Sequence, residues 1–124
     1  MRRKLIIDTD TGVDDAMALL MALEAHKRGQ VEVLAITAVA GNTEESHAQR
    51  NILRTIGINL FSCRGHIMLP LDSIGCPDIP VYRGAEEAMV VTYNNDEHYH
   101  GVDGFNDVTF DTCPDTSRSG GTVQ

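Results

Sequence analysis

Residues 4–23 read KLIIDTDTGVDDAMALLMAL and contain the strongest structural signal in this 124-residue chain. The apolar run at residues 5–7 is short and rich in branched side chains, which predicts a strand buried on both faces. Gly12 lies in the turn that follows, where glycine lets the backbone bend sharply. Residues 14–27 then repeat apolar side chains at helical spacing with little polar surface on the other side, which predicts a buried helix.

Four carboxylates fall within eight residues of this segment, at Asp8, Asp10, Asp14 and Asp15. A strand, a turn and a helix in this order gather them at the carboxyl end of the strand, the usual ligand edge of an open α/β sheet. Two like charges about 5 Å apart repel by roughly 3 kcal/mol at an effective dielectric constant near 20, so the cluster predicts a bound cation. Oxygen ligands without a nearby histidine or cysteine favour calcium or magnesium over zinc.

Two other interpretations apply to the acidic cluster. An EF-hand loop starting at Asp8 is excluded, because it needs glycine at its sixth position and glutamate at its twelfth, where this chain has Val13 and Leu19. The simpler alternative is that the aspartates only cap a helix and solvate a turn. Capping explains Asp14 alone, but it does not explain four acids around one glycine.

The remaining periodicity predicts an α/β domain with an open, mostly parallel sheet and flanking helices. The expected strands cover about residues 4–8, 31–39 and 79–82, and the expected helices cover about 14–27 and 44–56. Asn42 follows the second strand and therefore lies at the same sheet edge as the acidic turn. His100 lies in a polar loop and is a candidate to face a ligand.

Composition limits the partners and the location. A net charge of −8 argues against binding nucleic acid and is compatible with a small neutral ligand held through a metal. The apolar run after the basic start ends at Asp8, too early for a signal peptide or a membrane span, so a cytoplasmic protein without a membrane partner is expected. The three cysteines, Cys63, Cys76 and Cys113, fit no metal spacing and predict free thiols.

Four motifs in the chain resemble those of the inosine-uridine-preferring nucleoside hydrolase family. Residues 8–16, DTDTGVDDA, are similar to the family signature DxDxGxDDAxA, and residues 33–42, VLAITAVAGN, resemble its second strand and Gly-Asn loop. Residues 79–85, IPVYRGA, look like its third strand, and residues 100–104, HGVDG, match its HGxxG loop. These motifs follow the family's order over about the first 108 residues, so a Rossmann-like nucleoside hydrolase fold is implied.

The resemblance implies an N-ribosyl hydrolase that releases free base and ribose from a purine or pyrimidine nucleoside. By resemblance, Asp10 and Asp15 bind Ca²⁺, and Asp10 also takes the proton from a calcium-bound water. Asp14, Asn42 and His100 would contact the substrate. Asp8 receives no such role and is expected to brace the loop through hydrogen bonds. The family also allows a homo-oligomer for the full-length protein.

Two segments depart from the family pattern. Residues 57–76 are longer than the usual connection between the second helix and third strand, so we expect an atypical insert there. Residues 109–124 are polar and glycine-rich and predict an irregular tail. Family members run to more than twice this length, so residues 1–108 are expected to be the amino-terminal part of a nucleoside hydrolase domain. Its active site would then be incomplete and weakly active or inactive.

Two alternative functions remain open from sequence. Residues 6–10, IIDTD, also resemble the strand end of haloacid-dehalogenase-type phosphatases, with Asp8 as nucleophile, Asp10 as acid and base, and Mg²⁺ as cofactor. That family places threonine or valine where this chain has Gly12, and it gives no role to the acids that follow. The second alternative is a truncated isoform that binds a cation or a partner without turnover.

Overall fold

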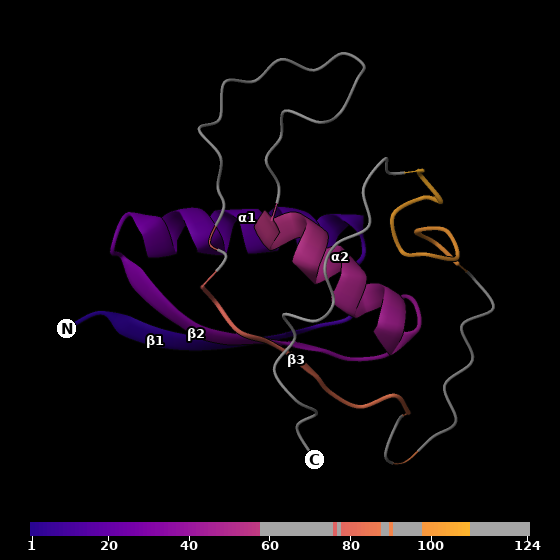
Figure 1. The fold of residues 1–124 in the computed structure, drawn as a ribbon, viewed down its shortest axis with the longest axis horizontal. Coiled ribbons are helices and arrows are strands. Elements are labelled where there is room, and N and C mark those ends of the chain that lie inside the picture. The colour runs from indigo at the N-terminus through magenta and orange to yellow at the C-terminus, as the bar shows by residue number, and fades with distance from the viewer. Residues whose placement is uncertain (58–75, 77, 88–89, 91–97, 110–124) are drawn as a thin grey trace.

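The computed structural model describes residues 1–57, 76, 78–87, 90 and 98–109, in which strands alternate with helices (Figure 1). In chain order the elements are β1 (Arg3–Thr9), α1 (Val13–Lys27), β2 (Val31–Ala38), α2 (Glu45–Gly57) and β3 (Val81–Arg83). All strand pairs are parallel, and the sheet order is β1-β2-β3. The predicted α/β class and element order are confirmed, and each boundary lies within two residues of its expected place.

Both helices cover the same face of the sheet, where they also contact each other (Figure 1). The apolar side of α1 supplies Leu19 and Leu23 to the core, while Ile36 of β2 and Ile52 of α2 are fully buried between the layers. Parallel strands joined by helices bring all strand carboxyl ends to one edge. That edge is where the candidate site forms.

The expectation that β1 and α1 are buried on all sides is wrong. Ile6 of β1 is 68% exposed, and Met17 and Met21 of α1 are 61% and 70% exposed. The reason is that both described helices lie on one face of the sheet, so every second side chain of β1 meets solvent, as does the outer side of α1.

No helix among the described residues has the length and hydropathy needed to cross a membrane.

A β-bulge interrupts the pairing of the first two strands. Leu5 pairs with Val33, but Ile6 pairs with Ala35, so β2 contains one extra residue at this point. The imidazole Nδ1 of His26, near the end of α1, accepts a hydrogen bond from the Val33 N–H at 2.9 Å. The helix that packs over the bulge therefore satisfies a backbone donor there.

One ion pair ties β3 to the start of α2. The Nε and Nη2 atoms of Arg83 both donate to Oε2 of Glu45, at 3.0 and 2.7 Å. The Glu45 side chain is only 2% exposed, and its hydrogen bond and charge raise the pKa of Arg83. This contact fixes the amino end of α2 beside the carboxyl end of β3.

The ends of the expected insert lie next to each other. The N–H of Cys76 donates to the carbonyl of Ile56 at 3.3 Å. Cys76 is a buried free thiol, as predicted, and burial raises its pKa. Residues 58–75 between these points lie outside the described residues, as do Cys63, Cys113 and the predicted tail from residue 110.

Candidate active site

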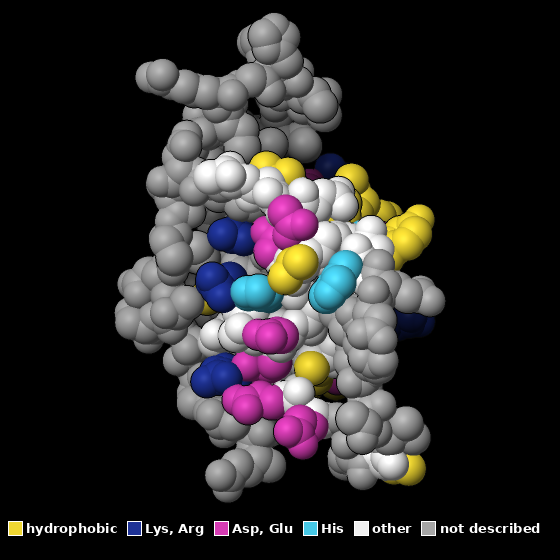
Figure 2. Space-filling model, turned by 90° about the vertical axis from the view of Figure 1, so that its right-hand side faces the viewer, with side chains coloured by type: hydrophobic (Ala, Val, Ile, Leu, Met, Phe, Trp, Pro, Cys, Tyr) yellow, Lys and Arg dark blue, Asp and Glu magenta, His cyan; other side chains and the backbone are white. Residues whose placement is uncertain are grey.

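The turn between β1 and α1 and the first turn of α1 together carry three aspartates at the carboxyl edge of the sheet. Figure 2 shows acidic side chains beside histidines on the side of the molecule where the strands end. Because α1 begins at Val13, Asp14 and Asp15 occupy its first turn, where the helix dipole favours negative charge. Asp15 Oδ2 accepts a hydrogen bond from the N–H of Gly12, the N-cap residue, at 2.9 Å. The carboxylate of Asp15 is thus oriented by its own helix end.

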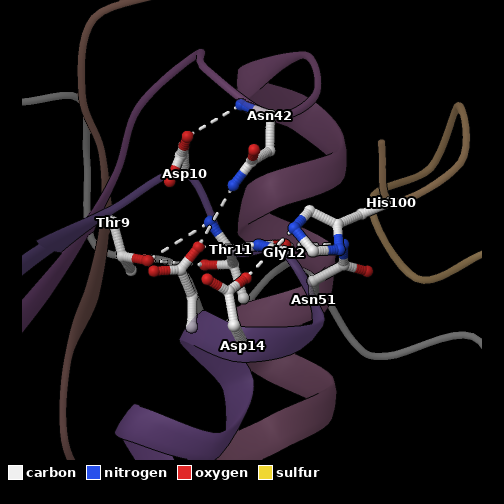
Figure 3. Close-up of polar contacts among 9 residues, drawn as sticks. Thr9, Asp10, Thr11, Gly12, Asp14, Asn42, Asn51 and His100 are labelled. Atoms are coloured by element: carbon white, nitrogen blue, oxygen red, sulfur yellow. Dashed lines mark hydrogen bonds and ion pairs between the residues drawn. The ribbon is translucent and has the colours of Figure 1, made fainter. Parts of the chain in front are cut away.

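Asn42, in the turn after β2, bonds to two of these carboxylates. Its main-chain N–H donates to Asp10 Oδ2 at 2.7 Å (Figure 3), and its side-chain Nδ2 lies 3.3 Å from Asp15 Oδ2. Gly41 allows this approach, because a Cβ atom at that position would overlap the Asp10 carboxylate. The structure therefore brings Asp10, Asp15 and Asn42 together.

The electrostatics of Asp15 reflect this crowding. Its pKa is raised above the ordinary aspartate value, chiefly by burial and further by the charges of Asp10 and Asp14, while the Gly12 hydrogen bond acts in the opposite direction. A hydrogen-bonding interaction with Asp10 also raises it. Asp10 is therefore close enough to disfavour the ionised form of Asp15, a repulsion that a cation between them would relieve.

The residues present provide a partial fit to a calcium site. Among the described residues, no group of three or more histidine, cysteine or acidic side chains converges as a metal site. Asp10 and Asp15, which share Asn42 as a partner, are the two candidate protein ligands, and each can offer one or two oxygens. A charged, all-oxygen pair suits calcium or magnesium, although calcium takes about six to eight oxygens in all.

Asp8 bonds to the neighbouring strand β2. Its side chain is exposed, and its carboxylate accepts a hydrogen bond from the hydroxyl of Thr37, its partner in the β1–β2 register. Asp8 is thus the penultimate residue of β1, whereas Asp10 follows the last residue of the strand. This position fits a bracing role.

His100 reaches the acidic turn from the segment 98–109. Its Nε2 lies 3.1 Å from Asp14 Oδ1, and its ring packs on the backbone of Gly12 (Figure 3). A Cβ atom on Gly12 would lie only 2.7 Å from the ring, so glycine is needed for this contact. The Asp14 side chain is 76% exposed and that of His100 is 14% exposed. Asp14 is therefore accessible to a ligand while His100 is held against the turn.

Sequence reasoning missed the residues that support the site. Thr11 adopts a left-handed backbone conformation with φ of 27°, which is strained for a β-branched residue, and its N–H donates to the Thr9 hydroxyl at 3.2 Å. Asn51 of α2 is fully buried and contacts both the acidic turn and the segment with His100. The signal for Asn51 is a polar residue between Ala48 and Thr55 on the buried side of an amphipathic helix.

Comparison with known proteins identifies the family. A family model described as inosine-uridine preferring nucleoside hydrolase matches residues 5–122. The chain is 36% identical over 107 residues to uridine nucleosidase 1 of Arabidopsis thaliana, an alignment that covers 86% of this chain. It is 32% identical over 110 residues to the inosine-uridine preferring nucleoside hydrolase of Leishmania major, with 89% of this chain covered.

Solved structures agree with the sequence comparison. An inosine-guanosine nucleoside hydrolase structure is 35% identical, covers 93% of this chain and superposes with a TM-score of 0.61. This chain spans 26% and 29% of the Arabidopsis and Leishmania proteins and 28% of the solved structure, less than a third of each. The fold, the acidic turn and these matches together establish that the chain belongs to the inosine-uridine preferring nucleoside hydrolase family.

Proposed function

We propose that Asp10, Asp14, Asp15, Asn42 and His100 form the part of an N-ribosyl hydrolase site that holds the sugar and activates water. The reaction breaks the bond between C1′ of the ribose and a ring nitrogen of the base. Water adds to C1′, and the base leaves with the electron pair of the broken bond. The water loses a proton, and the departing base gains one.

The observation that carries this proposal is the convergence of two carboxylates on one asparagine at the ligand edge of the sheet. Asp10 Oδ2 lies 2.7 Å from the main-chain nitrogen of Asn42, and Asp15 Oδ2 lies 3.3 Å from its side-chain nitrogen. Membership of a family described by its preference for inosine and uridine supports the reaction class and a nucleoside substrate.

Asp10 and Asp15 are the residues that would hold a calcium ion. Their carboxylate oxygens are the ligand type that calcium prefers, and their mutual repulsion supports a cation between them. When bound, calcium would fix the vicinal ribose hydroxyls and make a water molecule more acidic. Two protein ligands leave most coordination positions to water or substrate, so we expect weak binding by this chain.

Asp10 is the residue that we assign as the general base. The Asn42 N–H fixes its carboxylate, so the ionised group is held in one orientation to accept the proton of the attacking water. A positioned base of this kind contributes about 100- to 10,000-fold to a rate. Glycoside cleavage also develops positive charge at the sugar, and the neighbouring carboxylates would stabilise that charge.

Asp14 and His100 are assigned to substrate binding. Their side chains lie 3.1 Å apart at the exposed rim of the acidic turn, so a ribose hydroxyl arriving there would meet a carboxylate acceptor and an imidazole together. Asn42, whose nitrogens bond to Asp10 and Asp15, would face the sugar and the water. Among the described residues we assign no proton donor to the leaving base.

The proposal also covers the partners and the cellular location of the protein. We expect a small nucleoside as the partner, no nucleic acid or membrane, a cytoplasmic location and a homo-oligomer for the family-length protein. Because catalytic groups act as a unit and this chain spans less than a third of its relatives, we expect the 124-residue chain alone to hydrolyse nucleosides slowly or not at all. The non-catalytic alternative would show cation binding without any turnover after extension to family length.

Calcium binding is tested on the chain itself by isothermal titration calorimetry. Asp15→Ala should abolish the binding heat, because it removes one of two charged ligands. Asp8→Asn is the matched control, since it neutralises an aspartate in the same segment that bonds only to Thr37 among the contacts of the described residues. Equal calcium affinity in the parent chain and Asp15→Ala would contradict the ligand assignment.

Turnover is tested on a chain extended to family length with the remaining residues of the Leishmania relative. The extended protein should release ribose and free base from inosine or uridine. Asp10→Asn should lower kcat by about 100- to 10,000-fold, because the amide keeps an oxygen but accepts the water's proton poorly. Asp8→Asn should retain activity. Equal loss in both variants, or phosphate release from a phosphoester that Asp8→Asn removes, would overturn the proposal.

A further inference from the structure

The side-chain amide of Asn51 contacts the two separate segments that carry the candidate site. It lies in α2 and is fully buried. Its Nδ2 donates to the carbonyl of Thr11 in the acidic turn, at 3.2 Å, and to the carbonyl of Asp103 in the segment that carries His100, at 2.7 Å. Its Oδ1 accepts a hydrogen bond from Nη1 of Arg54 at 3.1 Å. An uncharged amide supplies two donors and an acceptor in this arrangement, which neither an aspartate nor an apolar side chain can do.

The first of these bonds reaches Asp15 through a single peptide group. The carbonyl of Thr11 and the N–H of Gly12 belong to one planar unit, so fixing the carbonyl direction also fixes the opposite N–H. That N–H is the donor that Asp15 Oδ2 accepts at 2.9 Å. Thr11 has a φ of 27°, and such a conformation persists only where surrounding contacts determine it. Asn51 is one of those contacts (Figure 3).

The second bond fixes the segment that delivers His100. Asp103 lies three residues after His100, and the preceding carbonyl, that of Val102, accepts a hydrogen bond from the Thr43 hydroxyl at 2.7 Å. Among the described residues, the Thr43 hydroxyl bonds to the segment with His100 but not to the acidic turn. The Asn51 amide bonds to both. His100 and Gly12 therefore belong to two segments whose carbonyls, those of Asp103 and Thr11, bond to the same amide.

We propose that Asn51 is a positioning residue that sets the Asp15 carboxylate and the His100 ring relative to each other. It contacts neither side chain and acts through the Thr11–Gly12 peptide and the backbone of Asp103. The importance of the pair rests on the proposed function, in which Asp15 binds the cation and His100 the substrate. The geometric coupling itself is a property of the 124-residue chain and is measured without either ligand.

The test is an NMR comparison of the parent chain with Asn51→Leu, which has similar volume but no hydrogen-bonding group. We expect the variant to lose the nuclear Overhauser effect between the His100 ring Hδ2 and the Gly12 Hα atoms. The Gly12 amide proton should also move upfield as its bond to Asp15 weakens. Thr55→Val is the matched control on the same buried side of α2, because its hydroxyl donates to the main-chain carbonyl of Asn51 at 2.8 Å. It should keep both signals.

Retention of both signals in Asn51→Leu, or their loss in Thr55→Val as well, would overturn the proposal. Should Asn51→Leu fail to fold, hydrogen exchange of the parent chain decides the matter. The Asn51 side-chain amide protons should then exchange with D₂O at least about ten times more slowly than those of Asn106, which is exposed. Equal exchange rates would show that the amide is not bound to the two carbonyls. Since these measurements use no calcium and no nucleoside, a failure of the proposed function is a separate result.

Discussion

The two strand-to-helix turns of this sheet, residues 10–12 and 39–44, lie side by side but contribute different chemistry. The first presents carboxylates at the start of α1, where burial and the charges of Asp10 and Asp14 raise the pKa of Asp15. The second presents the main-chain and side-chain nitrogens of Asn42, which bond to Asp10 and Asp15. One turn therefore supplies the charge, and its neighbour supplies the donors that hold that charge in place.

The same comparison shows that an acidic residue in the first turn of a helix can have either a binding or a structural role. Asp14 of α1 is 76% exposed and faces His100, so it is available to a ligand. Glu45 occupies the corresponding turn of α2, but its side chain is 2% exposed and is used to bind Arg83 of β3. The helix dipole favours both acids, yet only packing decides which one becomes part of a site.

The largest effect should come from Gly12→Ala, which breaks the contact between the first turn and the segment with His100. Its new methyl group would lie 2.7 Å from the imidazole and 3.0 Å from the Asn42 amide. Overpacking of this kind costs typically about 1–3 kcal/mol in the free energy of unfolding, which denaturant titration measures.

A double-mutant cycle controls that prediction. In a His100→Ala background the ring is absent, so Gly12→Ala should cost less by about 1 kcal/mol or more. If the substitution costs the same in both backgrounds, the contact between Gly12 and His100 is not what restricts the position.

Asn42→Asp tests the difference between the two turns, because it gives the neutral turn at residues 39–44 a negative charge like that of residues 10–12. The main-chain bond to Asp10 remains, but a third carboxylate replaces the amide donor beside Asp15. We expect a loss of about 1–2 kcal/mol in unfolding free energy at neutral pH, partly reversed by calcium. Asn42→Ala, which removes the amide without adding charge, should lose about 0.5–1.5 kcal/mol and respond little to pH. An Asn42→Asp stability that responds to pH no more than that of Asn42→Ala would contradict this prediction.

Asp15→Asn should have the smallest effect and the opposite sign. Because the pKa of Asp15 is raised in the folded chain, the folded state keeps this proton to higher pH than the unfolded state does. Stability therefore falls as pH rises from the ordinary aspartate pKa of 3.8 through the raised folded pKa, and the loss persists at neutral pH. Without a cation, the variant should thus be slightly more stable than the parent chain near pH 7.

Thermal unfolding between pH 3 and pH 7 measures this difference, which should disappear below the unfolded pKa. Asp14→Asn serves as the control, since the Asp14 side chain is mostly exposed and little stability is expected to depend on its charge. A stability difference for Asp15→Asn that stays constant with pH would show that charge is not its cause.

Sequence patterns predicted what depends on local order along the chain and missed what depends on packing. Strand and helix periodicity located every described element, and the glycine turn after Ile7 correctly brought Asp10 and Asp15 near Asn42. Periodicity does not reveal which sheet face a neighbouring element covers, so the exposure of Ile6 was not foreseen. The role of Asn51 depends on carbonyls 40 and 52 residues away in sequence, which no local pattern encodes.

The hydrogen bond between Cys76 and Ile56 has a consequence for tolerance to insertion and deletion. Because the chain returns at Cys76 to the point it left at Ile56, the number of intervening residues does not alter the spacing between α2 and β3. The entropic cost of closing a flexible loop rises only with the logarithm of its length, by about 0.6 kcal/mol for each doubling. A change in the number of residues between Ile56 and Cys76 should therefore cost little free energy and leave the two turns that form the site in place.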